Sequence, residues 1–309
     1  MFGDGPWLFR GCTYEAVLNR ISDLKFYLLA SALCLVLSAA NAFAWGKSGH
    51  MIVGEIAERN LTPKAKQAVD EILKGKRLGD DRVASWPDDI RHKKKWEATY
   101  PFNDKWHYID ISITTNRIAS LSNTVVSAIA HFAAVLKSNE PDAKRLDALR
   151  YLDHFVGDVH QPLHCACRNG DRGGNELKID SFTGTNVSQV SGSHYRDALN
   201  LHKVWDTLLV QESMGTNTTE VFANQLASEI TPAQKTTWAT GTPLDWAKET
   251  HMLARSSAYK WNGGQNMPTN GIIDLTRANY IDANSPVVRM QLKRAGIRLA
   301  TILNQAFGE

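Results

Sequence analysis

Residues 151–164 read YLDHFVGDVHQPLH, and three histidines and two aspartates lie within these fourteen residues. The apolar residues of the stretch recur at helical spacing: Leu152, Phe155, Val156 and Val159. His154 and Asp158 are four residues apart, so a helix places both side chains on one face. Pro162 ends or kinks that helix, and His164 follows the break with its own direction. Imidazole and carboxylate side by side suit zinc, although a helix with one polar face explains the same pattern.

A second pair with the same spacing, His202 and Asp206, lies within residues 200–209, which read NLHKVWDTLL. Its apolar stripe consists of Leu201, Val204, Trp205 and Leu208. This pattern also predicts an amphipathic helix. Further histidines and carboxylates occur in three short motifs nearer the N-terminus: WGKSGH at 45–50, WPDDIR at 86–91 and WHYID at 106–110. Each motif is weak by itself, but their order and chemistry together are specific.

These motifs, with HFVGDVHQPLH at 154–164, DRGGN at 171–175 and NLHKVWD at 200–206, occur in the order typical of one family. The chain resembles the S1/P1 nucleases, which are zinc-dependent and related in fold to bacterial phospholipase C. Residues 294–304 also resemble the last helix of that family. The resemblance extends from Trp45 to the C-terminus. It implies a single all-α helical domain of the phospholipase C/P1 nuclease type with a small β-hairpin.

The first 44 residues are predicted to precede the enzyme rather than belong to it. Residues 26–40 form a largely apolar run that follows Lys25 and precedes a small-x-small site at 41–44. This is the pattern of a secretory signal, and the run is shorter than the ~20 residues of a membrane span. We therefore expect an N-terminal extension and signal peptide over 1–44, cleaved after Ala44, and a nuclease domain over 45–309. A periplasmic or secreted protein without a membrane span in its mature form follows.

Composition supports one large domain. About 265 residues remain after residue 44, and no linker or repeat divides them. The leader carries three basic and three acidic residues, so the net charge stays at +3, which is too weak to indicate a polyanionic substrate.

Lys93–Lys95 form the only basic cluster, and it is expected to be a solvated surface run. Only Cys165 and Cys167 follow the leader, so no disulfide framework is expected, which departs from the fungal and plant relatives and indicates a bacterial protein. The pair could form a strained bond, bind zinc or be small buried residues, and the last is favoured.

Hydrophobic periodicity predicts helices almost throughout. Thr62 is expected to cap a helix that has Pro63 at its first position. Ser122 is expected to cap a helix over 125–136, and Asp142 to begin the helix that contains His154. The later predicted helices are Thr219–Glu229, Pro243–Lys260 and Ser285–Gln305. The strand signals are Glu176–Ile179 and part of Ser181–Val190. The stretch Ser181–Leu199, which includes His194, is longer than expected for the family and predicts a surface loop.

The resemblance implies three zinc ions, each held by nitrogen and oxygen donors. Their implied ligands are Asp88, His107, His154 and Asp158 for the first, His50 with the amine and carbonyl of Trp45 and a shared Asp158 for the second, and His164, His202 and Asp206 for the third. The amine of Trp45 becomes available only after cleavage at Ala44. Trp45 as a core aromatic is the alternative. The donor types do not exclude other divalent metals.

The implied reaction is hydrolysis of phosphodiester bonds in single-stranded DNA and RNA, which leaves 5′-phosphates. Two zinc ions can lower the pKa of a shared water towards ~7. Asp88 and Asp158 are the predicted catalytic carboxylates, and Arg91 is expected beside the phosphate unless it is merely solvated. Tyr108 is expected to stack on a base and Asn175 to bind a base edge or phosphate, or both support the zinc helices.

Two other functions compete with this interpretation. A zinc phospholipase C shares the fold and the metal set, but the WPDDIR, WHYID and DRGGN motifs favour the nuclease. A non-catalytic zinc-binding or adhesion protein predicts the loss of ligands, yet all nine matching positions carry groups that can bind metal. The expected partners are single-stranded DNA and RNA and nucleotides, with no stable protein partner. Activity on 3′-nucleotides stays open.

Overall fold

The structure is a computed structural model that describes residues 45–182, 185–186, 199–269, 271, 273–276 and 279–308. The predicted leader over 1–44 and its cleavage site lie outside the described residues. So does most of the predicted Ser181–Leu199 loop, including His194.

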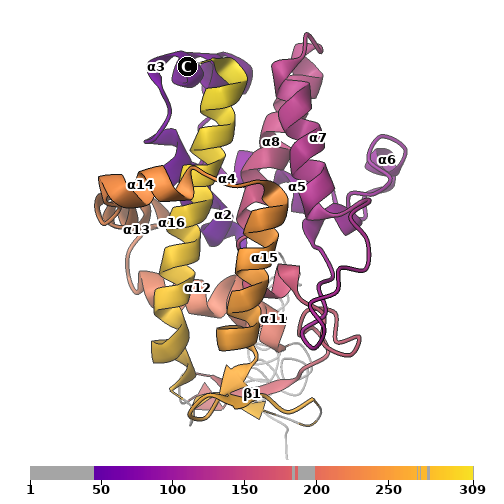
Figure 1. Ribbon diagram of the computed structural model, residues 1–309. Coiled ribbons are helices and arrows are strands. Elements are labelled where there is room, and N and C mark those ends of the chain that lie inside the picture. Colours follow the sequence, from indigo (N-terminus) through magenta and orange to yellow (C-terminus); the bar gives the residue numbers. More distant parts are fainter. Residues whose placement is uncertain are drawn as a thin grey trace, which may run out of the picture. The chain divides into compact units, whose positions relative to one another are not determined.

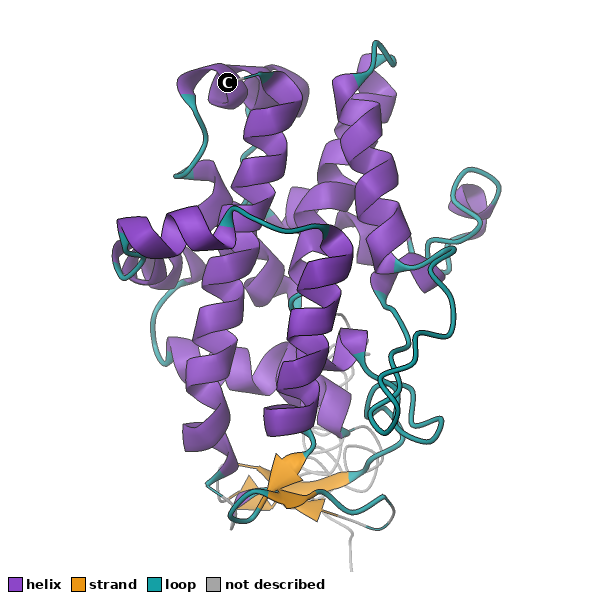
Figure 2. Cartoon of the chain, in the orientation of Figure 1, coloured by secondary structure: helices purple, strands orange, loops and turns teal. Residues whose placement is uncertain are grey.

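Helices make up most of the described chain, which confirms the prediction of an all-α domain (Figure 2). The α-helices are α2 (Lys47–Glu58), α3 (Pro63–Leu73), α4 (Asp81–Ala84), α5 (Trp86–Ile90), α6 (Lys94–Glu97), α7 (Val125–Lys137), α8 (Asp142–Asp158), α11 (Leu201–Lys203), α12 (Leu209–Met214), α13 (Thr219–Ser228), α14 (Pro232–Trp238), α15 (Pro243–Leu253) and α16 (Tyr280–Phe307). Two 3₁₀ helices, η1 (Lys105–His107) and η2 (Pro162–Cys165), and two π-helical turns, η3 (Val204–Leu208) and η4 (Ala254–Ala258), complete the set.

The C-terminal half of helix α8 lies inside the helical domain. Every residue from Tyr151 to Asp158 is buried, so its C-terminal half is enclosed on all sides. Helices α2, α7 and α16 pack against it (Figure 1). Gly296 of α16 permits a close approach to α2, because a Cβ atom there would lie 2.4 Å from Cγ2 of Ile56. The tight packing of α2 and α16 holds α8 and its polar residues away from solvent.

Local sequence signals explain where several helices begin. Thr62 accepts a hydrogen bond from the amide of Ala65 with Pro63 in the first turn, which confirms that predicted cap. The predicted cap at Ser122 is wrong. Thr124 caps α7 instead, because its side chain and that of Ser127 form a reciprocal capping box.

Short strands lie at one end of the helical domain (Figure 2). Strand β1 (Ile179–Phe182) pairs antiparallel with β2 (Thr185–Asn186) and parallel with β5 (Ile273–Asp274). A separate hairpin joins β3 (Lys260–Trp261) to β4 (Gln265–Asn266). The strand expected at Glu176–Ile179 begins only at Ile179, because residues 172–176 form turns. The small hairpin of β1 and β2 confirms the strand signal expected within Ser181–Val190, and only the start of its first strand differs from the prediction.

Two further expectations concern the membrane and the cysteines. No helix of the described part of the chain has the length and apolar character that a bilayer crossing requires. Cys165 and Cys167 are free thiols. Cys165 is fully buried and its thiol donates a hydrogen bond to the carbonyl oxygen of Val159 at 3.4 Å, whereas Cys167 is half-buried. The first cysteine thus fits the expectation of a small core residue.

Candidate metal centre

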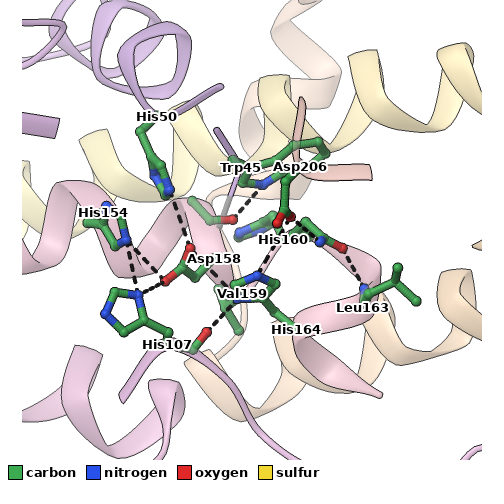
Figure 3. A network of polar contacts seen from close by, with 12 residues as sticks. Trp45, His50, His107, His154, Asp158, Val159, His160, Leu163, His164 and Asp206 are labelled. Atoms are coloured by element: carbon green, nitrogen blue, oxygen red, sulfur yellow. Dashed lines mark hydrogen bonds and ion pairs between the residues drawn. The ribbon is translucent and has the colours of Figure 1, made fainter. Parts of the chain in front are cut away.

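Helix α8 places the central carboxylate of the candidate site. His154 and Asp158 lie one turn apart, with Nε2 of His154 3.5 Å from Oδ2 of Asp158. His107, from η1, places Nδ1 3.0 Å from the same oxygen and 3.1 Å from Nε2 of His154. All three side chains are buried. Figure 3 shows Asp158 between these two imidazoles, His50 and His164.

Two more ligand candidates approach from other helices. His50 of α2 stacks on the ring of His154 at 3.7 Å, and its Nε2 lies 3.4 Å from Oδ1 of Asp158. Gly157 makes this approach possible, since a Cβ atom there would lie 2.8 Å from Nδ1 of His50. Asp88 of α5 lies 3.7 Å from ring nitrogens of both His107 and His154. The structure therefore brings all five predicted side chains of the first two ion sites together.

A second group lies beyond the proline break. His164 lies on η2, two residues after Pro162, and its Nε2 is 3.1 Å from Nε2 of His202 and 3.8 Å from Oδ1 of Asp206. Nε2 of His202 is 3.3 Å from Oδ2 of Asp206. The expected α-helix through these residues is wrong in detail. Residues 204–208 form a π-helical turn, a form often found at functional sites.

Backbone carbonyl groups determine the tautomer of three histidines. Nδ1 of His154 donates to the carbonyl oxygen of Ala84 at 2.8 Å. Nδ1 of His164 donates to that of His107 at 2.6 Å, and Nδ1 of His202 to that of Gly173 at 2.8 Å. Each Nε2 is then left with its lone pair directed into the cluster.

Burial governs the charge of the cluster. It lowers the pKa of His154 to about 3 and that of His202 to about 4, and it lowers the pKa values of His107 and His164 well below their usual range. The imidazoles are therefore neutral and able to bind metal. Burial also raises the pKa values of the three carboxyl groups, to about 7 for Asp88 and well above the usual range for Asp158 and Asp206. A bound cation would offset that cost.

The donor geometry fits metal ions. Three sets of side chains have ligand atoms within 4.8 Å of one another: His50, Asp88 and His154; His107, His154 and Asp158; and His164, His202 and Asp206. Ligands about 2.0–2.1 Å from a tetrahedral ion lie about 3.3–3.4 Å apart, close to the 3.0–3.8 Å separations observed. Among the described residues, Oδ1 of Asp158 and Oδ2 of Asp206 find no hydrogen-bond partner although they are buried. Unpaired buried acceptors are costly, so the residues fit a metal-bound state.

Trp45 lies at the edge of the same cluster. Its indole is fully buried, and Nε1 donates to the carbonyl oxygen of Gly157 at 2.8 Å. The amide of Gly46 donates to the carbonyl oxygen of Asp206 at 2.6 Å. The core role of the Trp45 ring and a ligand role for its backbone are therefore compatible, because different atoms of the residue perform them.

The other predicted site residues lie at the rim. Nη1 of Arg91 is 3.7 Å from Oδ1 of Asp88, but Nε bonds Asp104 at 2.6 Å. Arg91 follows α5 rather than continuing it. Tyr108 is 37% exposed, which leaves part of its ring available to a ligand. The side-chain amide of Asn175 donates to the carbonyl oxygen of Arg172 at 2.8 Å, so it holds the DRGGN turn.

Two further buried residues, in the turn that precedes Pro162, support the site. Gln161 donates from Nε2 to Oδ1 of Asp206 at 2.5 Å and accepts from the amide of Leu163. His160 donates from Nδ1 to the carbonyl oxygen of Val156 and accepts at Nε2 from Arg298 at 2.9 Å. His160 is thus a turn-stabilising residue outside the three metal groups. The signal for Gln161 was its position between two ligand motifs.

Comparison with known proteins gives the family. Residues 45–308 match the family described as S1/P1 Nuclease. Endonuclease 4 of Arabidopsis thaliana is 29% identical over 309 aligned residues, which cover 90% of this chain and 94% of that protein. Nuclease P1 of Penicillium citrinum is 27% identical, with 85% and 98% covered, and Nuclease S1 of Aspergillus oryzae is 25% identical, with 85% and 91% covered.

Fold, site and relatives together define a hydrolase that acts on phosphodiester bonds. The chain belongs to the S1/P1 nuclease family. This membership confirms the resemblance drawn from the six motifs and favours the nuclease over the phospholipase C alternative. The three His/Asp groups are where metal can bind.

We predict that Gln161→Leu weakens zinc binding by the group of His164, His202 and Asp206. The variant removes the amide that orients the Asp206 carboxylate, and such outer partners typically change metal affinity by roughly 10- to 100-fold. Competition with a chromogenic chelator measures the change. Gln291→Leu is the matched control, because Gln291 is also buried and bonds the carbonyl of His160 but no ligand side chain. Equal zinc affinity in the Gln161 variant and the native protein would contradict the prediction.

Proposed function

We propose that this protein hydrolyses phosphodiester bonds in single-stranded DNA and RNA in a zinc-dependent reaction that leaves 5′-phosphates. Three zinc ions are proposed, with the ligands inferred from the sequence. The first is held by Asp88, His107, His154 and Asp158, the second by His50, Trp45 and Asp158, and the third by His164, His202 and Asp206.

One observation supports this proposal above the others. Nε2 of His164 and Nε2 of His202 lie 3.1 Å apart, although each ring already donates through Nδ1 to a carbonyl oxygen. Both facing nitrogens then present lone pairs, an arrangement that is unfavourable unless a cation lies between them. The low pKa values of both rings argue against a shared proton as that cation.

Zinc bound by these groups would supply a water of lowered pKa and would stabilise negative charge on phosphate oxygens. The residues of the chain orient the substrate. Arg91 lies partly exposed beside Asp88 and can hold a phosphate oxygen. Burial lowers its pKa, but the carboxylates of Asp88 and Asp104 outweigh this effect and raise the pKa above the usual value. The exposed ring of Tyr108 offers a stacking surface that tolerates any base. Asn175 would contact a base edge or phosphate from the DRGGN turn.

Export is part of the proposal. Cleavage after Ala44 would give Trp45 a free amine, and the following residue already bonds the backbone of Asp206. The α-amine has a pKa near ~7.7, so a neutral fraction that can bind metal exists at neutral pH. In an uncut chain the same nitrogen is an amide, which is a poor metal donor.

A substrate panel tests the proposed function. The form that begins at Trp45, loaded with zinc, should cleave denatured DNA and RNA with little base preference and should not cleave phosphatidylcholine. The cleavage products should carry 5′-phosphates, as shown by ligation without prior phosphorylation. Products that end in 3′-phosphates, or hydrolysis of the lipid alone, would contradict the proposal.

Asp158→Asn is expected to remove at least one zinc ion and to lower the rate by roughly 100-fold or more, beyond the effect of outer partners. Asp158 is the carboxylate proposed to bridge two ions, and an amide is a poor bridge. Metal analysis and rate measurements on the same preparation check this. Asp153→Asn is the matched control, because Asp153 is equally buried on α8 but belongs to no metal group. A fully active Asp158 variant with native zinc content would refute the bridging role.

An extension before Trp45 should impair the enzyme. Retaining residues 42–44 converts the proposed amine ligand into an amide, so zinc should fall to about two ions per chain at limiting metal, with the helical fold intact. Metal analysis, circular dichroism and turnover measure these effects. The same three residues added to the C-terminus serve as a control. If both extended forms bind as much zinc and react as fast as the form that begins at Trp45, the N-terminal ligand is not needed.

A further inference from the structure

A lysine-bearing segment adjoins the candidate site. Residues 92–105 link α5, which carries Asp88, to η1, which carries His107. Within this segment four lysines are exposed: Lys93, Lys94, Lys95 and Lys105. In Figure 1 the short helix α6 of this segment projects sideways from the helical domain. We call residues 92–105 the basic arm.

The base of the basic arm is anchored in the aromatic core. The ring of Trp96 lies 5.4 Å from that of Trp86, the first residue of α5, and 6.0 Å from that of Tyr100. The hydroxyl of Tyr100 donates to Asp147 at 2.7 Å, and its ring packs on Tyr151 of α8. The arm is therefore attached to the same two helices that carry Asp88 and Asp158. A run of solvated surface lysines without a function would not require this attachment to the core.

The lysines of the basic arm have no acidic partner. Among the described residues, no ion pair joins any of these four ammonium groups to a carboxylate. The two acidic residues of the arm are Glu97, on α6, and Asp104, which bonds Arg91 at 2.6 Å and lies 3.8 Å from His92. Lys95 lies over the Trp96 ring at 5.2 Å. The ammonium groups are thus exposed and outside the ion pairs of the described residues, and the arm that carries them is attached to α5 and α8.

We propose that the basic arm is a second binding site for the nucleic-acid strand, at which Lys93, Lys94 and Lys95 contact phosphates outside the scissile bond. The proposal rests on the proposed nuclease function. It assigns a function to these lysines, for which the sequence alone predicts only a solvated surface run. Phe102, on the same arm, is exposed and offers an aromatic ring on which a base of a single strand can stack.

Phosphate contacts by lysine have a recognisable salt dependence. Each contact releases condensed counterions, so the logarithm of the binding constant falls with the logarithm of salt concentration, with a slope of about −0.7 per contact for single strands. Three contacts change the slope by about 2. Raising NaCl from about 50 to about 200 mM should then weaken native binding by roughly 16-fold more than binding by a variant that lacks the three lysines.

The test uses the triple variant Lys93→Ser, Lys94→Ser, Lys95→Ser in the zinc-loaded protein. Fluorescence anisotropy with a labelled phosphorothioate oligothymidylate of about 20 nucleotides measures binding at several NaCl concentrations, and hydrolysis of the unmodified oligonucleotide and of a dinucleotide measures turnover. We expect weaker binding, a salt slope that is smaller by about 2, and a higher KM for the long substrate. Cleavage of the dinucleotide, which spans only the metal groups, should stay at the native rate.

The matched control removes the same charge elsewhere, by Lys76→Ser, Lys137→Ser and Lys235→Ser at exposed positions on other parts of the fold. An equal change of the salt slope in both triple variants would reduce the effect to net charge and overturn the proposal. A native slope in the basic-arm variant would overturn it as well. If the proposed nuclease function itself were wrong, the native protein would cleave neither the dinucleotide nor the long substrate. That result differs from both outcomes that would overturn the basic-arm proposal.

Discussion

The structure depends on the cost of burying carboxylates without enough hydrogen-bond donors. Asp158 has no exposed surface, and its neighbours in the cluster are neutral imidazoles rather than protonated ones. Such a group is tolerable in a folded protein only if it takes up a proton or a positive charge joins it. Helix α8 is enclosed by α2, α7 and α16, and this enclosure both creates the cost and keeps competing water away. Stability and metal binding are therefore linked in one set of residues.

Much of this arrangement could be predicted from the sequence because its chemistry is local. The spacing of His154 and Asp158 needs only a helix to bring them together, and Pro162 signals the break that redirects His164. The structure has both features. The cap residue of α7 could not be predicted in this way, since Ser122 and Thr124 offer the same hydroxyl group. The reciprocal bond with Ser127 selects Thr124, and that choice depends on local geometry rather than on composition.

Other parts of the site depend on contacts between distant segments. No spacing rule joins His107 to α8, so only the resemblance to the family placed it in the cluster. The π-helical turn at Val204–Leu208 was missed because periodicity cannot separate it from an α-helix over so few residues. Gln161 and Gly157 act through neighbours, one by bonding Asp206 and the other by leaving room for His50. The attachment of the basic arm likewise could not be predicted from the sequence, because it depends on the packing of Trp96 against Trp86.

The segment from Asp158 to His164 has a consequence for how the chain can change in evolution. It joins the two halves of the metal centre through six peptide units, all buried and all shaped by internal hydrogen bonds. An inserted or deleted residue here would rotate His164 away from His202 and alter the reach between the halves. Loops at the surface carry no such restriction, since their length does not enter that reach. The length of this segment therefore sets the spacing between the two groups of metal ligands in this chain.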